Sequence, residues 1–165
     1  MNIKIKARTV KNWSTHMALL IKVMLVSKGD VVEVGGGLYS TPLLHWMCKN
    51  MDRKLITYEN DPTFIELAKG FQSENHHVII IENWDEMDFK THRGVVFIDH
   101  HPNERRAIDV INFKDSADYI VIHDTEDEQK HKWSKAWNHF KYRLDWKDCK
   151  PWTSVVSNFK DLSNL

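Results

Sequence analysis

The sequence is poor in cysteine, and no low-complexity segment or internal repeat interrupts it. Its two cysteines, Cys48 and Cys149, are too few for a disulfide framework and do not form a Cys-x-x-Cys pair. Free thiols suit a reducing compartment, so we expect a cytoplasmic protein. The 165 residues amount to one domain, and we expect a single domain over residues 1–165 whose core needs no disulfide.

The chain also lacks a net charge, because 23 Lys and Arg residues balance 23 Asp and Glu residues. This balance argues against a protein whose main partner is nucleic acid or an anionic membrane. The charge is nevertheless unevenly placed, since six basic residues precede the first acidic residue, Asp30. Residues 1–28 therefore form a basic N-terminal segment, which either packs on the domain as a helix or serves as a lid or docking arm.

Long hydrophobic runs are missing as well. The apolar stretch over residues 17–26 is interrupted by Lys22 and is too short to span a bilayer. No small-x-small cleavage site follows it, as a secretory signal would require. We expect no membrane partner, and we predict a helix over residues 12–27 that is entered through Ser14 or Thr15.

From residue 30 onward, strand patterns alternate with helix patterns. Five strand–helix units with short connections predict a parallel sheet with right-handed crossovers and helices on both faces. We therefore predict an α/β fold with a doubly wound, Rossmann-like sheet of seven strands, mostly parallel and ending in an antiparallel pair. The predicted strands cover residues 30–34, 54–58, 77–81, 94–98, 118–122, 140–146 and 152–159, and helices are predicted to begin near residues 40, 62, 102 and 125.

Acidic residues and histidines follow most of the predicted parallel strands. In such sheets, ligands bind outside the carboxyl ends of the strands, where the strand order reverses. A strand end that only supports the fold needs no acid or histidine, so this edge is the predicted site. Of the ten histidines, only His100, His101 and His123 fall there.

The turn after the first predicted strand indicates the kind of ligand. Gly35, Gly36 and Gly37 allow a tight turn that approaches a ligand closely. With Ser40 and an acid at Glu59, they have the spacing of a dinucleotide-binding fingerprint. A carboxylate at Glu33 would oppose a pyrophosphate and suit a cationic group, which favours a zwitterionic or sulfonium cofactor over NAD.

The segment Glu33-Val-Gly-Gly-Gly-Leu-Tyr-Ser40 resembles the first motif of class I S-adenosylmethionine-dependent methyltransferases, with Tyr39 in place of the usual third glycine. The resemblance extends over roughly residues 28–160. It implies that Glu59 binds the ribose hydroxyls and that Asn83, Trp84 and Asp85 contact the adenine. The cofactor-binding residues expected on this basis are Glu33, Gly35, Gly36, Gly37, Tyr39, Ser40, Glu59, Asn60, Asn83, Trp84, Asp85 and Asp99.

The segments around Asp99 and Asp124 are similar to small-molecule O-methyltransferases of the catechol type. In that family, a metal is held by an acid after strand four and an Asp-Asn pair after strand five. Here Thr125 stands in place of the Asn, and Pro102 stands where a catalytic lysine is expected. We therefore expect no metal, and Asp99 and Asp124 are the two carboxylates that could hold a divalent ion such as Mg²⁺.

The predicted function is methyl transfer from S-adenosylmethionine to an oxygen or nitrogen atom of a small-molecule acceptor. Asp99, His100 and Asp124 are the candidate catalytic residues, as proton acceptors or hydrogen-bonding groups. Three alternatives stay open: a non-catalytic protein that binds the cofactor, an enzyme that uses it for another reaction, and an NAD-type module. The sequence is compatible with a homo-oligomer.

Several residues also have simpler structural interpretations. Asp61 reads as the N-cap of the helix that starts at Pro62, and Thr125 with Glu128 reads as a capping box. The histidines at the predicted strand starts, His76, His77 and His92, are expected at the surface.

Overall fold

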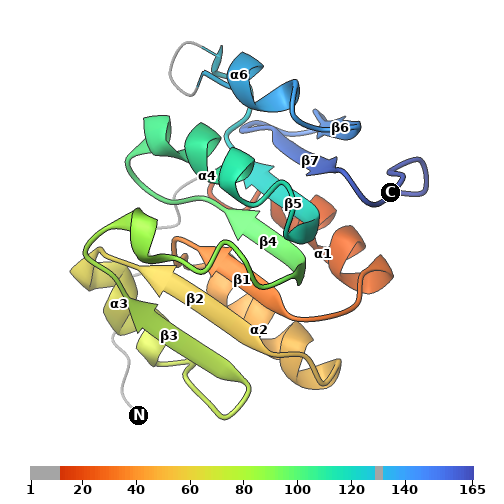
Figure 1. Ribbon diagram of the computed structural model, residues 1–165. Coiled ribbons are helices and arrows are strands. Elements are labelled where there is room, and N and C mark those ends of the chain that lie inside the picture. Colours follow the sequence, from red (N-terminus) through yellow and green to blue (C-terminus); the bar gives the residue numbers. More distant parts are fainter. Residues whose placement is uncertain (1–11, 129–131) are drawn as a thin grey trace.

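The computed structural model describes residues 12–128 and 132–165. Seven strands form one sheet in the order β3-β2-β1-β4-β5-β7-β6 (Figure 1). The first five strands are parallel, and β7 runs antiparallel to both β5 and β6. The predicted fold class is thereby confirmed. The strands are β1 (Val31–Val34), β2 (Leu55–Glu59), β3 (His76–Ile80), β4 (Arg93–Ile98), β5 (Ala117–His123), β6 (Tyr142–Trp146) and β7 (Thr153–Ser157).

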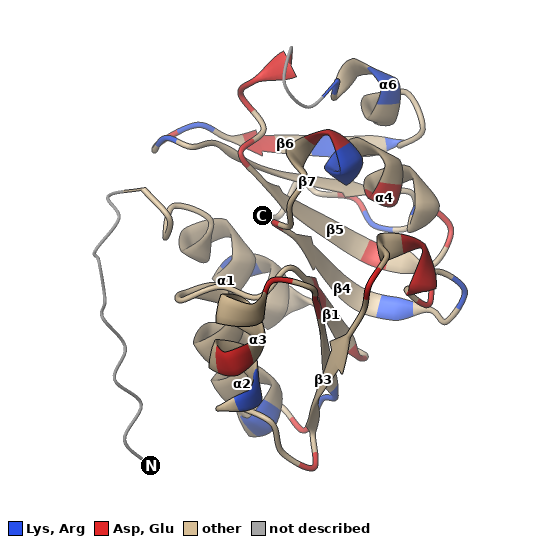
Figure 2. Ribbon diagram, turned by 90° about the vertical axis from the view of Figure 1, so that its left-hand side faces the viewer, with Lys and Arg blue, Asp and Glu red and all other residues tan. Residues whose placement is uncertain are grey.

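Helices cover both faces of the sheet, which Figure 2 shows edge-on. One face carries the three longer helices from the first part of the chain, and the other carries shorter helical segments (Figures 1 and 2). The first group is α1 (Met17–Val26), α2 (Ser40–Asn50) and α3 (Pro62–Lys69), and the second is η1 (Trp84–Glu86), η2 (Asn103–Arg105), α4 (Arg106–Asn112) and α6 (Ser134–Trp137).

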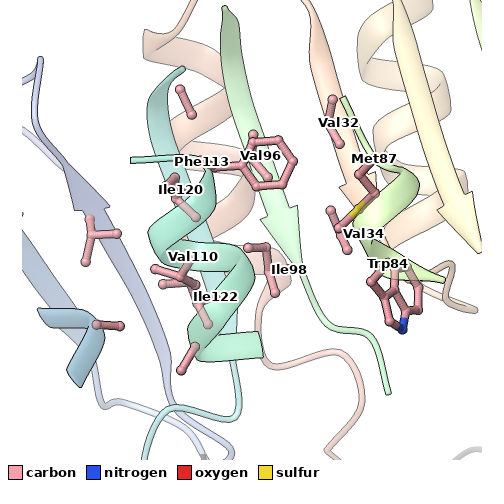
Figure 3. Close-up of a cluster of buried hydrophobic side chains, with 14 of the residues drawn as sticks. Val32, Val34, Trp84, Met87, Val96, Ile98, Val110, Phe113, Ile120 and Ile122 are labelled. Atoms are coloured by element: carbon pink, nitrogen blue, oxygen red, sulfur yellow. The ribbon is translucent and has the colours of Figure 1, made fainter. Parts of the chain in front are cut away.

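The core has two layers because side chains alternate across each strand. Val32 and Val34 of β1 face α4 and η1, where they join one buried cluster with Trp84 and Phe113 (Figure 3). Val31 faces the opposite way and joins a second cluster with residues of α1 and α2. The central strands are buried on both faces, so they form a rigid base for the loops that follow them.

The helices differ from the prediction at several boundaries. Helix α1 begins at Met17 with His16 as its N-cap residue, so neither Ser14 nor Thr15 starts it. Residues 102–113 form η2 followed by α4 rather than one helix. Of the helix predicted from residue 125 to about 139, residues 129–131 lie outside the described part, and α6 accounts for only four of the rest.

The predicted capping box at Thr125 is wrong. The Thr125 hydroxyl lies 2.8 Å from the Ser154 hydroxyl of β7, and the Glu128 carboxylate accepts a hydrogen bond from the backbone N–H of Ser134. Thr125 therefore ties the end of β5 to β7. Of the basic N-terminal segment, residues 1–11 lie outside the described part of the chain.

The apolar run over residues 78–81 predicts a strand that is buried on both faces, and this prediction is wrong for β3. It lies at the edge of the sheet, and Ile79 and Ile80 expose 38% and 52% of their surface. His76, predicted at the surface, is buried, and its Nε2 lies 2.8 Å from the Thr57 hydroxyl. None of the helices in the described ranges is both long enough and apolar enough to span a membrane.

Candidate active site

A cavity of about 630 Å³ opens where the parallel strands end. Its wall combines the loop after β1, the ends of β2, β4 and β5, and the residues just before α1. A volume of this size accommodates a ligand of drug or cofactor size. Ten of the residues predicted from the sequence border it: Gly35, Gly36, Gly37, Tyr39, Ser40, Glu59, Asn60, Asp99, His100 and Asp124.

The glycine loop packs directly against the end of β4. Gly35 has a φ of +89°, and a Cβ atom built on it would lie 2.7 Å from the Cα of His100. Only glycine combines that backbone conformation with so close an approach. The next residue, Gly36, donates its backbone N–H to Glu59 Oε2 at 2.6 Å, so the loop is fixed from two sides.

Glu59 organises the cavity wall at the end of β2. Its other oxygen, Oε1, accepts hydrogen bonds from the backbone N–H groups of Asn60 and Asp61 at 2.7 and 2.8 Å. Burial raises the pKa of Glu59, against the lowering effect of these three N–H groups. Since a carboxylate accepts about four hydrogen bonds, roughly one acceptor position remains for a ligand. Asp61 has the predicted role of N-cap, because it accepts from Thr63 N–H.

Asp99 and Asp124 both contact one buried cation. Arg106, the first residue of α4, places Nη1 at 3.0 Å from Asp99 Oδ1 and at 3.0 Å from Asp124 Oδ2. Its Nε donates to the carbonyl of His100 at 2.6 Å. Burial alone would raise the pKa of Asp99, but the Arg106 guanidinium and the His123 ring lower it to about 2. Asp99 therefore borders the cavity as an anion, and Asp124 borders it as well.

The metal position implied by the catechol-type resemblance does not fit this arrangement. A divalent ion between Asp99 and Asp124 would have to share that position with the guanidinium of Arg106. Thr125 supplies no ligand there either, because its hydroxyl is paired with Ser154. Arg106 thus occupies the position between the two acids that a metal would take.

His100 borders the cavity, but its ring is turned into the core. The side chain has no exposed surface, and Nε2 lies 3.0 Å from Asp109 Oδ2 of α4. The ring also packs on Trp84, with their centroids 4.2 Å apart. His100 therefore joins β4 to α4 and offers the cavity little beyond its backbone.

Solved structures resemble this chain although no protein-family model and no curated protein matches its sequence. A methyltransferase from Pyrococcus furiosus superposes with a TM-score of 0.61 at 13% identity, covering 88% of this chain and 84% of the other. The SAH-bound methyltransferase PaMTH1 from Podospora anserina gives 0.65 at 11% identity, with 88% and 77% covered. This chain has the class I methyltransferase fold.

The methyltransferase fold places the predicted adenine-contacting residues away from the cavity. The Trp84 ring is buried and donates its Nε1–H to the carbonyl of His101 at 2.8 Å. Asn83 caps η1, and Asp85 pairs with Arg105 at 2.6 Å. Of these three residues, Trp84 contacts residues that border the cavity, namely His100 and His101. The aromatic residues Trp13, Tyr39 and Phe64 border the cavity themselves.

Glu33 lies beneath the glycine loop of the methyltransferase fold and does not border the cavity. Its buried carboxylate accepts hydrogen bonds from the hydroxyls of Thr41 and Thr57 at 2.9 and 2.7 Å. Thr41 in turn accepts the backbone N–H of Gly37. Burial raises the pKa of Glu33 to about 7, although the neighbouring hydroxyl groups lower it.

The polar residues at the site that were not assigned a role from the sequence include His16, Arg106 and His123. His123 Nδ1 lies 3.2 Å from Asp99 Oδ2, and the neighbouring carboxylates raise its pKa although burial opposes them. His16 is only 2% exposed, and burial lowers its pKa to about 4. The position of His123 after a strand was a usable signal, whereas His16 and Arg106 fell inside predicted helices.

Proposed function

We propose that the protein is an S-adenosylmethionine-dependent methyltransferase that acts on an oxygen or nitrogen atom of a small-molecule acceptor. The observation that carries the proposal is the single cavity wall that joins the Gly35–Gly37 loop, Glu59 and Asp99. These groups suit the separate parts of the cofactor. The fold supports the same proposal, since several of the solved structures that resemble this chain are methyltransferases.

The cofactor has a cationic sulfonium, a cationic amino group and ribose hydroxyls. The free acceptor position of Glu59 would take a ribose hydroxyl, and the anionic Asp99 and Asp124 favour the cationic end. The backbone at the start of α2, beside Ser40, is suited to the carboxylate of the methionine part, because a helix N-terminus attracts anions. Tyr39 and Asn60 complete the expected binding set at the cavity wall.

Methyl transfer is an in-line displacement in which the acceptor atom forms a bond to the methyl carbon as the carbon–sulfur bond breaks. The sulfur keeps the electron pair, and S-adenosylhomocysteine (SAH) leaves as a neutral thioether at that atom. The proton that the methyl group replaces on the acceptor is released to water. Alignment of the two reactants supplies most of the acceleration. In our proposal Asp99 and Asp124 orient the acceptor by hydrogen bonds.

Asp99 is a weak base, because its pKa is about 2. It is therefore poorly suited to removing a proton from an aliphatic alcohol. This favours acceptors that ionise readily or carry a free lone pair, such as phenols, carboxylic acids and amines. Of the three catalytic candidates from the sequence, Asp99 and Asp124 remain in the proposal, and His100 does not because its ring is buried against Asp109.

Calorimetric titration of the purified chain with S-adenosylmethionine, SAH and NAD⁺ tests the cofactor. We expect the first two to bind and NAD⁺ not to bind; selective binding of NAD⁺ would refute the proposal. Incubation with methyl-labelled cofactor and a panel of phenols, acids and amines then tests transfer. Labelled product with an equal amount of SAH supports a methyltransferase, whereas cofactor breakdown without a labelled acceptor indicates another reaction.

A further inference from the structure

Three side chains from distant parts of the chain converge at one end of the cavity. His16 precedes α1, Asp99 follows β4 and His123 ends β5, and one ligand atom from each lies within 4.8 Å of the other two. All three residues border the cavity. Asp99 Oδ2 faces His123 Nδ1, whereas Arg106 contacts Oδ1 of the same carboxylate.

The hydrogen bonds of Thr15 determine which nitrogen of His123 carries a proton. The Thr15 hydroxyl lies 2.8 Å from the carbonyl oxygen of Pro151, to which it can only donate its single proton. It must then accept from His123 Nε2, which lies 2.9 Å away. In the neutral ring, Nδ1 consequently has a lone pair that faces Asp99 Oδ2 at 3.2 Å. Two electron-rich atoms at that distance call for a positive species between them, which is either a proton on Nδ1 or a metal ion that takes the place of that proton.

His16 provides a second, independent indication. Its ring is 2% exposed and packs between the rings of Phe97 and His123, with centroid distances of 4.8 and 4.9 Å. Within residues 12–128 and 132–165, neither ring nitrogen of His16 has a hydrogen-bond partner. A buried polar group without a partner has lost its contacts with water and gained none in return, so such a group beside a cavity is suited to binding a ligand there.

We propose that His16, Asp99 and His123 bind a divalent first-row transition metal ion such as Zn²⁺. Two imidazole nitrogens and one carboxylate oxygen are a typical donor set for such an ion, whereas Mg²⁺ prefers oxygen ligands throughout. The Thr15 hydroxyl serves as the outer partner that orients the His123 ring. Donor atoms around one zinc ion lie about 3.3 Å apart. Closure therefore needs a shift of up to about 1.5 Å, which the His16 ring can supply because no hydrogen bond from the described residues fixes its orientation.

The local charge also favours a cation. Asp99 and Asp124 contribute two negative charges and Arg106 one positive charge, and the two imidazoles are neutral when they act as ligands. The group therefore has a net charge of about −1 before a metal binds. This site differs from the one implied by the catechol-type resemblance, because Arg106 lies between Asp99 and Asp124. A role for the metal in holding the acceptor rests on the proposed methyltransferase function, but the metal site itself does not.

Cobalt binding tests the site without reference to activity. The chain is treated with a chelator, dialysed and titrated with Co²⁺, and visible absorption and equilibrium dialysis report binding. We expect one tightly held Co²⁺ per chain, displaced by Zn²⁺ and not by Mg²⁺. His16→Ala should weaken this binding by at least about 100-fold, since even the outer partners of a metal ligand are worth 10- to 100-fold.

Control variants separate this site from other histidines. His77→Ala removes an exposed histidine on β3 and should leave Co²⁺ binding unchanged. If His16→Ala does not fold, His16→Gln preserves more of the buried volume and should weaken binding similarly. Equal Co²⁺ affinity in wild type, His16→Gln and His77→Ala would overturn the proposal, as would loss of all Co²⁺ from the wild type on dialysis.

A parallel titration with SAH distinguishes this inference from the proposed function. If the metal-free chain binds SAH but retains no Co²⁺, the metal site is wrong and the cofactor proposal stands. If Co²⁺ binds in a His16-dependent manner and SAH does not bind, the metal site stands and the cofactor proposal is wrong.

Discussion

The guanidinium of Arg106 lies 3.0 Å from the carboxylate of Asp124, and this contact joins the start of α4 to the end of β5. Arg106 is 2% exposed, and the φ of Asp124 is +59°, a conformation that few residues other than glycine adopt. The ion pair therefore holds a strained strand end in place beside the cavity. Its removal should affect the stability of the whole domain and not only the site.

Arg106→Met tests this effect. It preserves the length of the side chain but leaves Asp99 and Asp124 without their buried cation. We expect the free energy of unfolding in urea to fall by about 3–5 kcal/mol, the usual cost of removing one partner from a buried ion pair. Arg143→Met is the matched control, because Arg143 pairs with Asp145 at the surface, and it should cost less than about 1 kcal/mol. Similar losses in the two variants would contradict a special role for Arg106.

Glu59→Gln tests the link between the glycine loop and the cofactor. In the wild type, the backbone N–H groups of Gly36, Asn60 and Asp61 donate to the Glu59 carboxylate. In the variant, the amide NH₂ group must face either the N–H of Gly36 or those of Asn60 and Asp61, so at least one of these hydrogen bonds is lost. We expect SAH affinity to fall on the order of 10- to 100-fold, which corresponds to the loss of charge-assisted hydrogen bonds. Calorimetry measures the change.

Glu66→Gln is the control for the Glu59 variant, since Glu66 lies exposed on α3. It should bind SAH as the wild type does. A Glu59→Gln variant that folds and binds SAH with unchanged affinity would remove Glu59 from the cofactor site.

The fold could be predicted from the sequence because, in most strands and helices, the local residue pattern agrees with the long-range packing. In β4, residues 95–98 are all apolar, and the structure buries this strand on both faces. Pro62, Asp61 and the three loop glycines separate the elements in the way that their backbone preferences dictate. Strand β3 has an equally apolar pattern yet lies at the edge, because strand order depends on the whole topology and not on the strand itself.

The site could be predicted only where its residues directly follow strands. Asp99 and Asp124 were found in this way, and both reached the cavity. Trp84 also follows a strand, but the direction of its side chain is set by packing against His100, which no local pattern reveals. His16 and Arg106 come from helix starts on opposite faces of the sheet, and only the tertiary structure brings them to the same cavity.

The buried carboxyl group of Glu33 should make stability depend on pH. Its pKa is about 7 in the folded protein, above the ordinary value of 4.5. The folded protein therefore keeps a proton that the unfolded chain releases, and the stability that Glu33 contributes at low pH is lost as the pH rises through about 7. Glu33→Gln removes this titration. As the pH rises from about 5 to about 8, the free energy of unfolding of the variant, measured in urea, should increase by about 2–3 kcal/mol relative to that of the wild type. This range follows from about 1.36 kcal/mol per pKa unit.

Glu66→Gln serves as the control here too, because an exposed carboxylate should give no such pH-dependent difference. The same Glu33→Gln protein also tests the predicted cofactor contact. Since Glu33 lies beneath the loop, we expect SAH affinity near pH 6 to change by less than about 10-fold. Such a change is smaller than the loss of one hydrogen bond to a charged group would cause. A stability difference that does not change with pH would contradict the raised pKa.

Gly35 should tolerate no side chain, and a second glycine in the same chain makes this testable. An alanine at position 35 would keep a φ of +89° and place its Cβ 2.7 Å from the backbone of His100. We expect Gly35→Ala to lower the free energy of unfolding by more than about 2 kcal/mol and to abolish SAH binding, because the loop must move away from β4. Gly70 ends α3 with a φ of −62°, which alanine adopts readily, so Gly70→Ala should leave stability within about 1 kcal/mol of wild type. If both variants melt at the wild-type temperature and bind SAH, the close approach of the loop to β4 is not required for either the fold or the site.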